Sequence, residues 1–404
     1  MSADPTIDLA GQAMTAVPAL PPTASADGAD GGADGTDGTD GGGAVDAQAA
    51  TLTSEPPASG ARRAGLLRPE RTEREAGPKV KLPRRSLHGV LLLDKPLGWT
   101  SNDALQKVKN LLRAEKAGHT GTLDPLATGL LPLCFGGATK FSQVSLEADK
   151  AYRATLHLGQ RTEGGDREGA VIEERPVNTD RAAIEAACAA YTGEIEQMPP
   201  MHSALKVQGK ALYEYARAGQ TVERQTRRVM IHAIDIVEWQ AERPETLVID
   251  VRCSKGTYIR TLAEDIGERL GCGAHLAALA RTAAGTVSLA QAVTLDALLA
   301  MDDEARLALL HPPDVLLTDW PRLELSVAEA GRFLTGARRR LDWPDTPRLR
   351  VYGPGGHAFF GSAHVQGGEL IADRLLSPVE IEAQLLAAQA ALTRATAQRA
   401  DVTH

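Results

Sequence analysis

The most restrictive feature of this 404-residue sequence is a stretch near its start that cannot fold by itself. Residues 26–46 consist almost entirely of glycine, alanine and aspartate. Such a segment cannot bury enough apolar surface to offset the conformational entropy that it would lose on ordering. We therefore predict that residues 1–86 form a disordered extension and that the folded part begins near Leu87.

Charge divides this extension into an acidic and a basic part. Residues 1–60 carry eight Asp, one Glu and no Lys or Arg, whereas residues 61–86 carry nine basic and three acidic residues. Because the whole chain has a net charge of −8, residues 87–404 have a net charge of −5. A mildly acidic body can still bind nucleic acid if its phosphate-binding surface is local. The basic part of the extension is either an RNA-contacting tail or a solvated one.

Cysteine spacing and hydropathy exclude several classes of protein. The four cysteines, at 134, 188, 253 and 272, form no CxxC pair, which argues against a disulfide framework or a zinc ribbon and is typical of a reducing compartment. No apolar run approaches 18 residues, and the N-terminus lacks the pattern of a signal peptide. We therefore expect a cytoplasmic protein that does not bind membranes.

Hydrophobic periodicity predicts strands and helices without a regular βαβ repeat, which favours an α+β fold over a doubly wound parallel sheet. Val90–Leu93 is typical of a short buried strand. From Tyr152 to Leu158, apolar and polar residues alternate, as in a strand with one polar face. Further strands are expected at 229–237 and 247–253, and helices are expected to begin near Ser101, Asp180 and Ile259.

A second module is predicted after His311-Pro312-Pro313, which is typical of a domain boundary. The pattern indicates a small β-rich domain at 313–378, followed by a helical or disordered tail at 379–404. Within that domain the expected elements are a helix at 327–334 and strands at 348–351, 358–360 and 370–372.

The most unusual segment runs from Gly118 to Pro132 and reads GHTGTLDPLATGLLP. Its glycines and Pro125 predict a structured loop rather than a helix or a strand. Asp124 lies between apolar residues, so a carboxylate buried there would need a cation nearby. Taken alone, an Asp-Pro pair more often forms an Asx turn. The glycine spacing matches neither a Walker loop nor GxGxxG, which argues against nucleotide binding.

HTGTLDPLATGLLP resembles the catalytic motif of the TruB family, the tRNA pseudouridine synthases that modify uridine 55 in the TΨC loop. The similarity runs from about Leu87 to Pro378. It implies a catalytic domain at 87–312 with a mixed or antiparallel sheet, and a PUA-like RNA-binding domain at 313–378. Five further segments agree in order, namely LDKP (93–96), KAYR (150–153), LGQRT (158–162), MPPMHSALK (198–206) and CSKGTYIRT (253–261).

The resemblance implies a reaction that breaks the N1–C1′ bond of uridine, turns the uracil and rejoins it through C5. No redox step is needed, so we expect no cofactor and no metal. Asp124 matches the catalytic aspartate of the family, Arg260 its basic partner, and Tyr152 the tyrosine that lies against the flipped base. From pattern alone, Tyr152 would be a core residue and Arg260 an exposed charge at the start of a helix.

Other residues are implied to bind substrate. His119 matches the histidine that fills the space left by the flipped nucleotide, although by itself it would be a loop histidine bonded to backbone. Tyr258 matches a substrate-contacting tyrosine, and Leu279 lies near a matching leucine. Lys95 is expected either to stabilise the loop or to contact RNA.

A basic segment is expected to bind RNA phosphates. Residues 201–230 carry six basic and two acidic residues. The resemblance implies a mobile insertion that orders around the T-loop, and a solvated charge run is the alternative. The expected backbone contacts are Lys206, Lys210, Arg227 and Arg228, and Arg338-Arg339-Arg340 of the second module are further candidates.

The sequence therefore predicts a stand-alone, monomeric tRNA uridine-55 pseudouridine synthase with no obligatory protein partner. Two alternatives are a tRNA-folding chaperone with little or no modification activity and the catalytic subunit of a guide-RNA particle. The set Asp124, Tyr152 and Arg260 favours an enzyme, because a chaperone needs no such carboxylate. The basic insertion favours RNA recognition without a guide.

Overall fold

We analysed a computed structural model of the chain, which describes residues 83–203, 205–340, 343–386 and 389. The predicted disordered extension lies outside the described residues, except for positions 83–86. Of the predicted tail, residues 379–386 belong to a helix that begins at 378, and almost all of the rest lies outside the described residues. No helix in the described ranges is long and apolar enough to cross a membrane.

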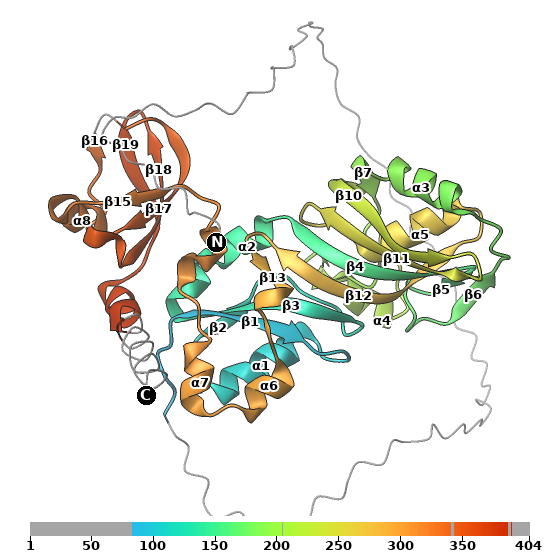
Figure 1. Cartoon of the computed structure of the whole chain (residues 1–404), viewed down its shortest axis with the longest axis horizontal. Helices are drawn as coiled ribbons and strands as arrows, with labels where there is room; N and C mark the ends of the chain where they lie inside the picture. Colours follow the sequence, from blue (N-terminus) through green and yellow to red (C-terminus); the bar gives the residue numbers. More distant parts are fainter. Residues whose placement is uncertain (1–82, 204, 341–342, 387–388, 390–404) are drawn as a thin grey trace, which may run out of the picture. The chain divides into compact units, whose positions relative to one another are not determined.

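A ten-stranded mixed sheet organises the larger part of the fold (Figure 1). Most neighbouring strands are antiparallel, whereas the β1–β14 and β3–β12 pairs are parallel. This confirms the predicted α+β class and mixed sheet. The order is β14 (Val293–Thr294), β1 (Gly89–Lys95), β3 (Ala127–Phe135), β12 (Ala274–Ala284), β4 (Lys150–Leu158), β11 (Arg243–Cys253), β10 (Arg227–Gln240) and β7 (Gly193–Gln197), with β2 (Ala117–His119) on β3 and β13 (Val287–Ser288) on β12.

Helices cover the two halves of this sheet through separate apolar clusters. Leucines of β1 and β3 pack with Ala104, Leu105 and Val108 of α1. Ile259 and Leu262 of α5 pack on strands β4, β11 and β12. Besides the helix that begins at 378, the described helices are α1 (Ser101–Leu111), α2 (Ser142–Glu147), α3 (Arg181–Ala190), α4 (Leu212–Arg217), α5 (Ile259–Arg269), α6 (Leu295–Ala300), α7 (Asp303–Ala308) and α8 (Val327–Leu334), with 3-10 turns at Gly136–Phe141, Leu289–Gln291, Pro313–Leu317 and Pro354–Gly356.

The irregular loop in the structure is shorter than the predicted loop, which ran from 118 to 132. Its first residues belong to β2 and its last six to β3, so the irregular part covers 120–126. β3 is buried along most of its length because it runs between β1 and β12, which explains its run of leucines. Glycine and proline content alone therefore overestimated the length of the loop.

The C-terminal module has its own sheet, as predicted for a small β-rich unit. Its five strands are ordered β15 (Arg322–Glu324), β17 (Thr346–Tyr352), β18 (Phe359–Gln366), β19 (Glu369–Leu375) and β16 (Arg339–Arg340). Helix α8 begins at a capping box formed by Ser326 and Glu329, which fits its predicted range.

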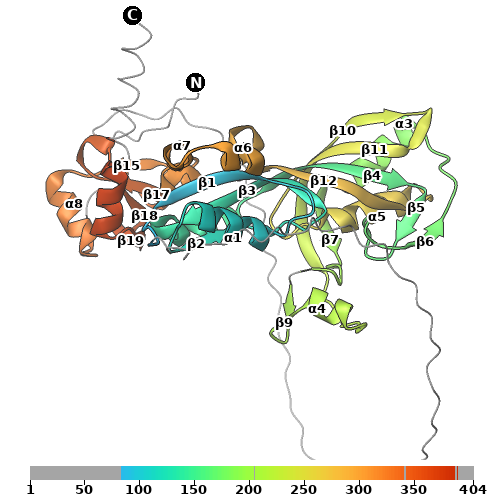
Figure 2. The same cartoon turned by 90° about the horizontal axis from the view of Figure 1, so that it is seen from below.

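Two small hairpins lie outside both sheets. The first pairs β5 (Gln160–Thr162) with β6 (Val171–Glu174), and the second pairs β8 (Lys206–Val207) with β9 (Lys210–Ala211). Figure 2 shows β9 and α4 extending away from the large sheet. These elements belong to the predicted basic insertion.

Candidate active site

A cavity of about 300 Å³ opens where the irregular loop, β4, β12 and the start of α5 meet. Its lining includes five of the predicted site residues, Asp124, Tyr152, Tyr258, Arg260 and Leu279. They come from four segments that are far apart in the sequence. A volume of this size lies within the range of small-molecule sites and suits a single base lifted out of its stack.

Asp124 and Arg260 form the ion pair that the resemblance implies. Arg260 Nη2 lies 2.8 Å from Asp124 Oδ2. The Arg260 side chain is 8% exposed, whereas the Asp124 side chain is 48% exposed. Asp124 is therefore not the buried carboxylate that its apolar neighbours suggested, because the loop presents it at the cavity. The buried member of the pair is the arginine, so it is not the exposed charge that pattern alone suggested.

Asp166 is a partner of Arg260 that the sequence did not reveal. Its Oδ2 lies 3.2 Å from Arg260 Nη1, and its side chain is only 13% exposed. The carbonyls of His202 and Gly164 also accept hydrogen bonds from Arg260. The guanidinium is thus held between two carboxylates, and Arg260 has little freedom to rotate.

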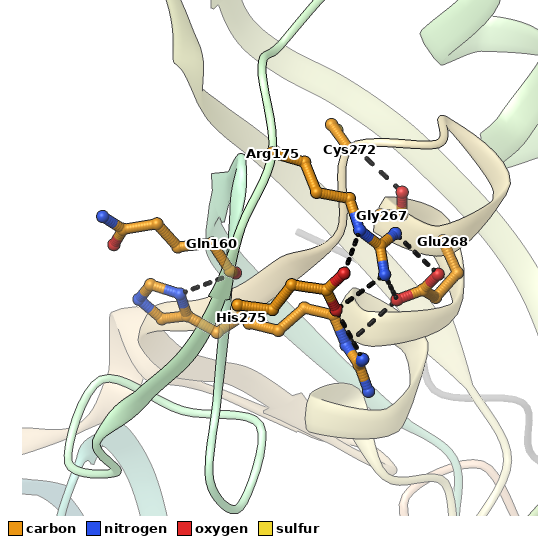
Figure 3. A network of polar contacts seen from close by, with 8 residues as sticks. Gln160, Arg175, Gly267, Glu268, Cys272 and His275 are labelled. Carbon is orange, nitrogen blue, oxygen red and sulfur yellow. Dashed lines mark hydrogen bonds and ion pairs between the residues drawn. The ribbon is translucent and has the colours of Figure 1, made fainter.

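Asp166 lies in the loop of the β5–β6 hairpin. Ion pairs connect this hairpin to the C-terminal end of α5 (Figure 3). Arg175, just after β6, donates to Glu268 of α5 over 2.9 Å and to Glu173 over 2.7 Å. Arg161 of β5 completes the group by pairing with both glutamates. The helix that carries Arg260 and the hairpin that carries Asp166 are therefore joined at two places.

Ser101 anchors the irregular loop from the other side. Its Oγ accepts a hydrogen bond from the Leu123 amide over 2.8 Å and donates one to the Leu123 carbonyl over 3.1 Å. Ser101 is 1% exposed at the start of α1. Because Leu123 directly precedes Asp124, this reciprocal pair fixes the backbone beside the carboxylate.

We expect Ser101→Ala to lower both stability and rate. The substitution leaves two buried backbone groups without partners, which should cost about 1–3 kcal/mol in the free energy of unfolding. A loosened Asp124 should slow single-turnover modification by about tenfold or more, since positioning errors reduce rate steeply. Urea unfolding and single-turnover kinetics measure the two effects. An unchanged rate would show that this anchor does not position Asp124.

Lys95 is fully buried at the end of β1. Its Nζ donates to the carbonyls of Pro96 and Trp99 over 3.0 and 2.6 Å. Burial, only partly offset by nearby Asp124, lowers the pKa of Lys95 to about 8. The geometry therefore favours loop stabilisation, the first of the two roles predicted for Lys95.

This lowered pKa makes the stability contribution of Lys95 depend on pH. Between about pH 8 and 10.5 the unfolded chain retains this proton and the folded chain loses it, so this group makes stability rise with pH. Below that window both states are charged and the full cost of burying the ammonium is present. The free energy of unfolding of wild type, relative to that of Lys95→Met, should be larger at about pH 9.5 than at about pH 7. Parallel pH profiles would contradict this, and Lys107→Met, on the exposed face of α1, is the control.

The remaining predicted residues lie around the cavity or beyond it. His119, at the end of β2, is not in the cavity lining, and burial lowers its pKa. Arg227 places its guanidinium 5.8 Å from the centre of the Tyr258 ring. Arg228 pairs with Glu194 on β7. Lys206 and Lys210 lie on the β8–β9 hairpin.

Comparisons with known proteins agree with this geometry. The model of the TruB family pseudouridylate synthase N-terminal domain matches residues 109–259, and that of the tRNA pseudouridylate synthase B C-terminal domain matches 260–318. A tRNA pseudouridine synthase B of Cupriavidus pinatubonensis is 59% identical over 303 residues, which is 73% of this chain and 96% of that protein. One of Ralstonia nicotianae is 57% identical over 312 residues, covering 76% and 99%.

Solved structures share the fold at lower identity. A complex titled Cbf5-Nop10-Gar1 aligns with a TM-score of 0.56 at 23% identity, covering 76% of this chain and 93% of that chain. An H/ACA RNP bound to a substrate RNA aligns with a TM-score of 0.55 at 22% identity, covering 72% and 86%. The high identity to full-length relatives confirms the resemblance read from the motifs. This chain therefore belongs to the TruB family of pseudouridylate synthases.

Proposed function

We propose that this enzyme converts uridine 55 in the TΨC loop of tRNA to pseudouridine, and that it does so without a guide RNA or a protein partner. Asp124 is the proposed catalytic carboxylate, and its ion pair with Arg260 orients it at the cavity. Tyr152 offers its ring to the flipped base. The observation that carries this proposal is the Asp124–Arg260 pair at the mouth of a base-sized cavity.

Support for stand-alone RNA recognition comes from the basic segment. Ser203 and Leu205 line the cavity, and the carbonyl of His202 accepts from Arg260. The segment that carries Lys206 and Lys210 therefore starts at the active site. Bound phosphates on these lysines, and on Arg227 and Arg228, would hold the T-arm over the cavity.

The second module is proposed as a PUA-like domain that contacts the tRNA elbow. Its separate five-stranded sheet supports a unit distinct from the catalytic domain at 87–312. Arg338 and Arg340 remain the proposed phosphate contacts there, whereas the side chain of Arg339 lies outside the described part of the chain. We further propose that the enzyme acts as a monomer in the cytoplasm, where its tRNA substrate is found.

The site of modification can be tested with an unmodified tRNA transcript and purified protein without additives. Carbodiimide labelling and primer extension should give one new stop, at the T-loop uridine. A transcript with cytidine at that position should give none. Stops at other uridines would contradict the assignment to position 55. Tight binding without any stop would instead support the chaperone.

A further inference from the structure

Arg281 is a buried cation whose place in the fold is explained by neither the sequence motifs nor the Asp124–Arg260 pair. It lies on β12, is 1% exposed, and reaches the inner lining of the cavity. Among the residues that the structure describes, no carboxylate lies within ion-pair distance of its guanidinium. Burying a charge without a counter-ion is costly, and an apolar side chain would fill the same space more cheaply.

The guanidinium lies beside three separate parts of the site and forms hydrogen bonds with two of them. Its Nε donates to the carbonyl of Leu130 on β3 over 2.7 Å, and its Nη2 donates to the carbonyl of Gly121 in the irregular loop over 3.2 Å. The third neighbour is Tyr152, which lines the same cavity. Tyr152 is its cross-strand partner on β4, so strand register places the two side chains together.

Two glycines of the motif make room for this arginine. A Cβ on Gly129 would lie 2.4 Å from the Arg281 carbonyl oxygen, and one on Gly121 would lie 3.1 Å from Arg281 Nη1. Both glycines also have positive φ, +95° and +83°. The close approach of the β12 backbone requires glycine at 129. At 121, the positive φ and the nearby guanidinium both favour glycine.

We propose that Arg281 is a positioning residue for pseudouridine formation, which holds the Tyr152 ring and the Gly121 end of the catalytic loop in the orientation that the flipped base requires. This rests on the proposed function, because it assigns Tyr152 to the base. The position of Arg281 opposite Tyr152 on the neighbouring strand holds the tyrosine ring, and the bond to Gly121 fixes the loop three residues before Asp124. Arg281 itself need not touch substrate, since it acts through these two groups.

The test is a double-mutant cycle of Arg281→Met and Tyr152→Phe. Single-turnover release of tritium from [5-³H]uridine tRNA measures the rate, and filter binding measures the Kd for tRNA. Arg281→Met should slow the rate by about 100-fold, with the Kd changed less than about threefold. In the Tyr152→Phe background the same change should cost no more than about tenfold, because one of the two groups it positions is already altered.

Controls separate positioning from stability. Arg350 is also 1% exposed, lies on β17 of the other sheet, and donates to the Trp320 carbonyl over 2.9 Å. Arg350→Met should lower the unfolding midpoint without slowing the single-turnover rate at saturating tRNA. If Arg281→Met does not fold, Arg281→Lys takes its place in the cycle, with a loss of about tenfold expected. Where both fold, Arg281→Lys should be at least about fivefold faster than Arg281→Met.

Three results would overturn the proposal. They are an Arg281 variant within threefold of wild type, equal losses in both Tyr152 backgrounds, and a loss that appears only in the Kd. A failure of the proposed function is distinguishable, because wild type itself would then release no tritium from this tRNA.

Discussion

Asp124→Asn should abolish pseudouridine formation while leaving tRNA binding nearly intact. The amide has the shape of the carboxylate but neither its charge nor its nucleophilicity. We expect the single-turnover rate to fall by at least about 1,000-fold, as for other enzymes that lose their reacting group. Because the Asp124 side chain is half exposed and its partner keeps a second carboxylate, the fold should tolerate the change.

A matched control is available on the same two strands, one residue away from Tyr152 and outside the cavity lining. Asp250 and Arg153 form a two-pronged pair between β11 and β4, with distances of 2.8 and 2.7 Å. Both side chains are well exposed, and neither lines the cavity. Asp250→Asn also removes a carboxylate that is paired with an arginine, but outside the cavity. It should leave the single-turnover rate unchanged. If Asp124→Asn retained a rate close to that of wild type, the catalytic assignment would be wrong.

Arg260→Met should have the second largest effect, on stability as well as on rate. The substitution leaves Asp166 buried without its cation, and breaking such a pair typically costs about 3–5 kcal/mol. The free Asp124 carboxylate also loses the group that orients it, so we expect the rate to fall by about 100- to 1,000-fold. Urea unfolding and single-turnover tritium release measure the two effects separately.

The double variant Arg260→Met with Asp166→Asn sharpens this prediction. Removing the stranded charge should restore part of the lost free energy of unfolding, because the uncompensated carboxylate is gone. The rate should not recover, since Asp124 still has no cation. Recovery of rate together with stability would show that Arg260 is purely structural. Arg153→Met is the control for loss of an exposed arginine.

Most of the elements that local patterns predicted are present in the structure. The alternation around Tyr152 marks β4, and Asp180 caps α3 as expected, since its Oδ1 accepts from the Ala183 amide over 2.8 Å. These signals depend on neighbouring residues, so a single sequence contains them. The same holds for the TruB motif, which led directly to Asp124.

Contacts between distant segments could not be predicted in this way. Asp166 and Arg260 are 94 positions apart, and Gly121 and Arg281 are 160 apart. Nothing in the sequence around Asp166 distinguishes it from a solvated turn residue. The sequence pattern pointed to Leu279 in this segment but not to Arg281. The burial of Arg281 depends on the β3–β12–β4 register, which local sequence does not reveal. The extent of the loop was overestimated for the same reason, since Gly129 in β3 accommodates a neighbouring strand rather than a turn.

Release of tritium from C5 shows whether this chain alone makes pseudouridine in tRNA. Purified protein would be mixed with an excess of [5-³H]uridine-labelled tRNA transcript, with no guide RNA, partner protein or cofactor. Because C5 exchanges its hydrogen for the new bond to C1′, we expect release of one tritium for each tRNA. Absence of release, or release only after a guide RNA or a partner is added, would contradict it.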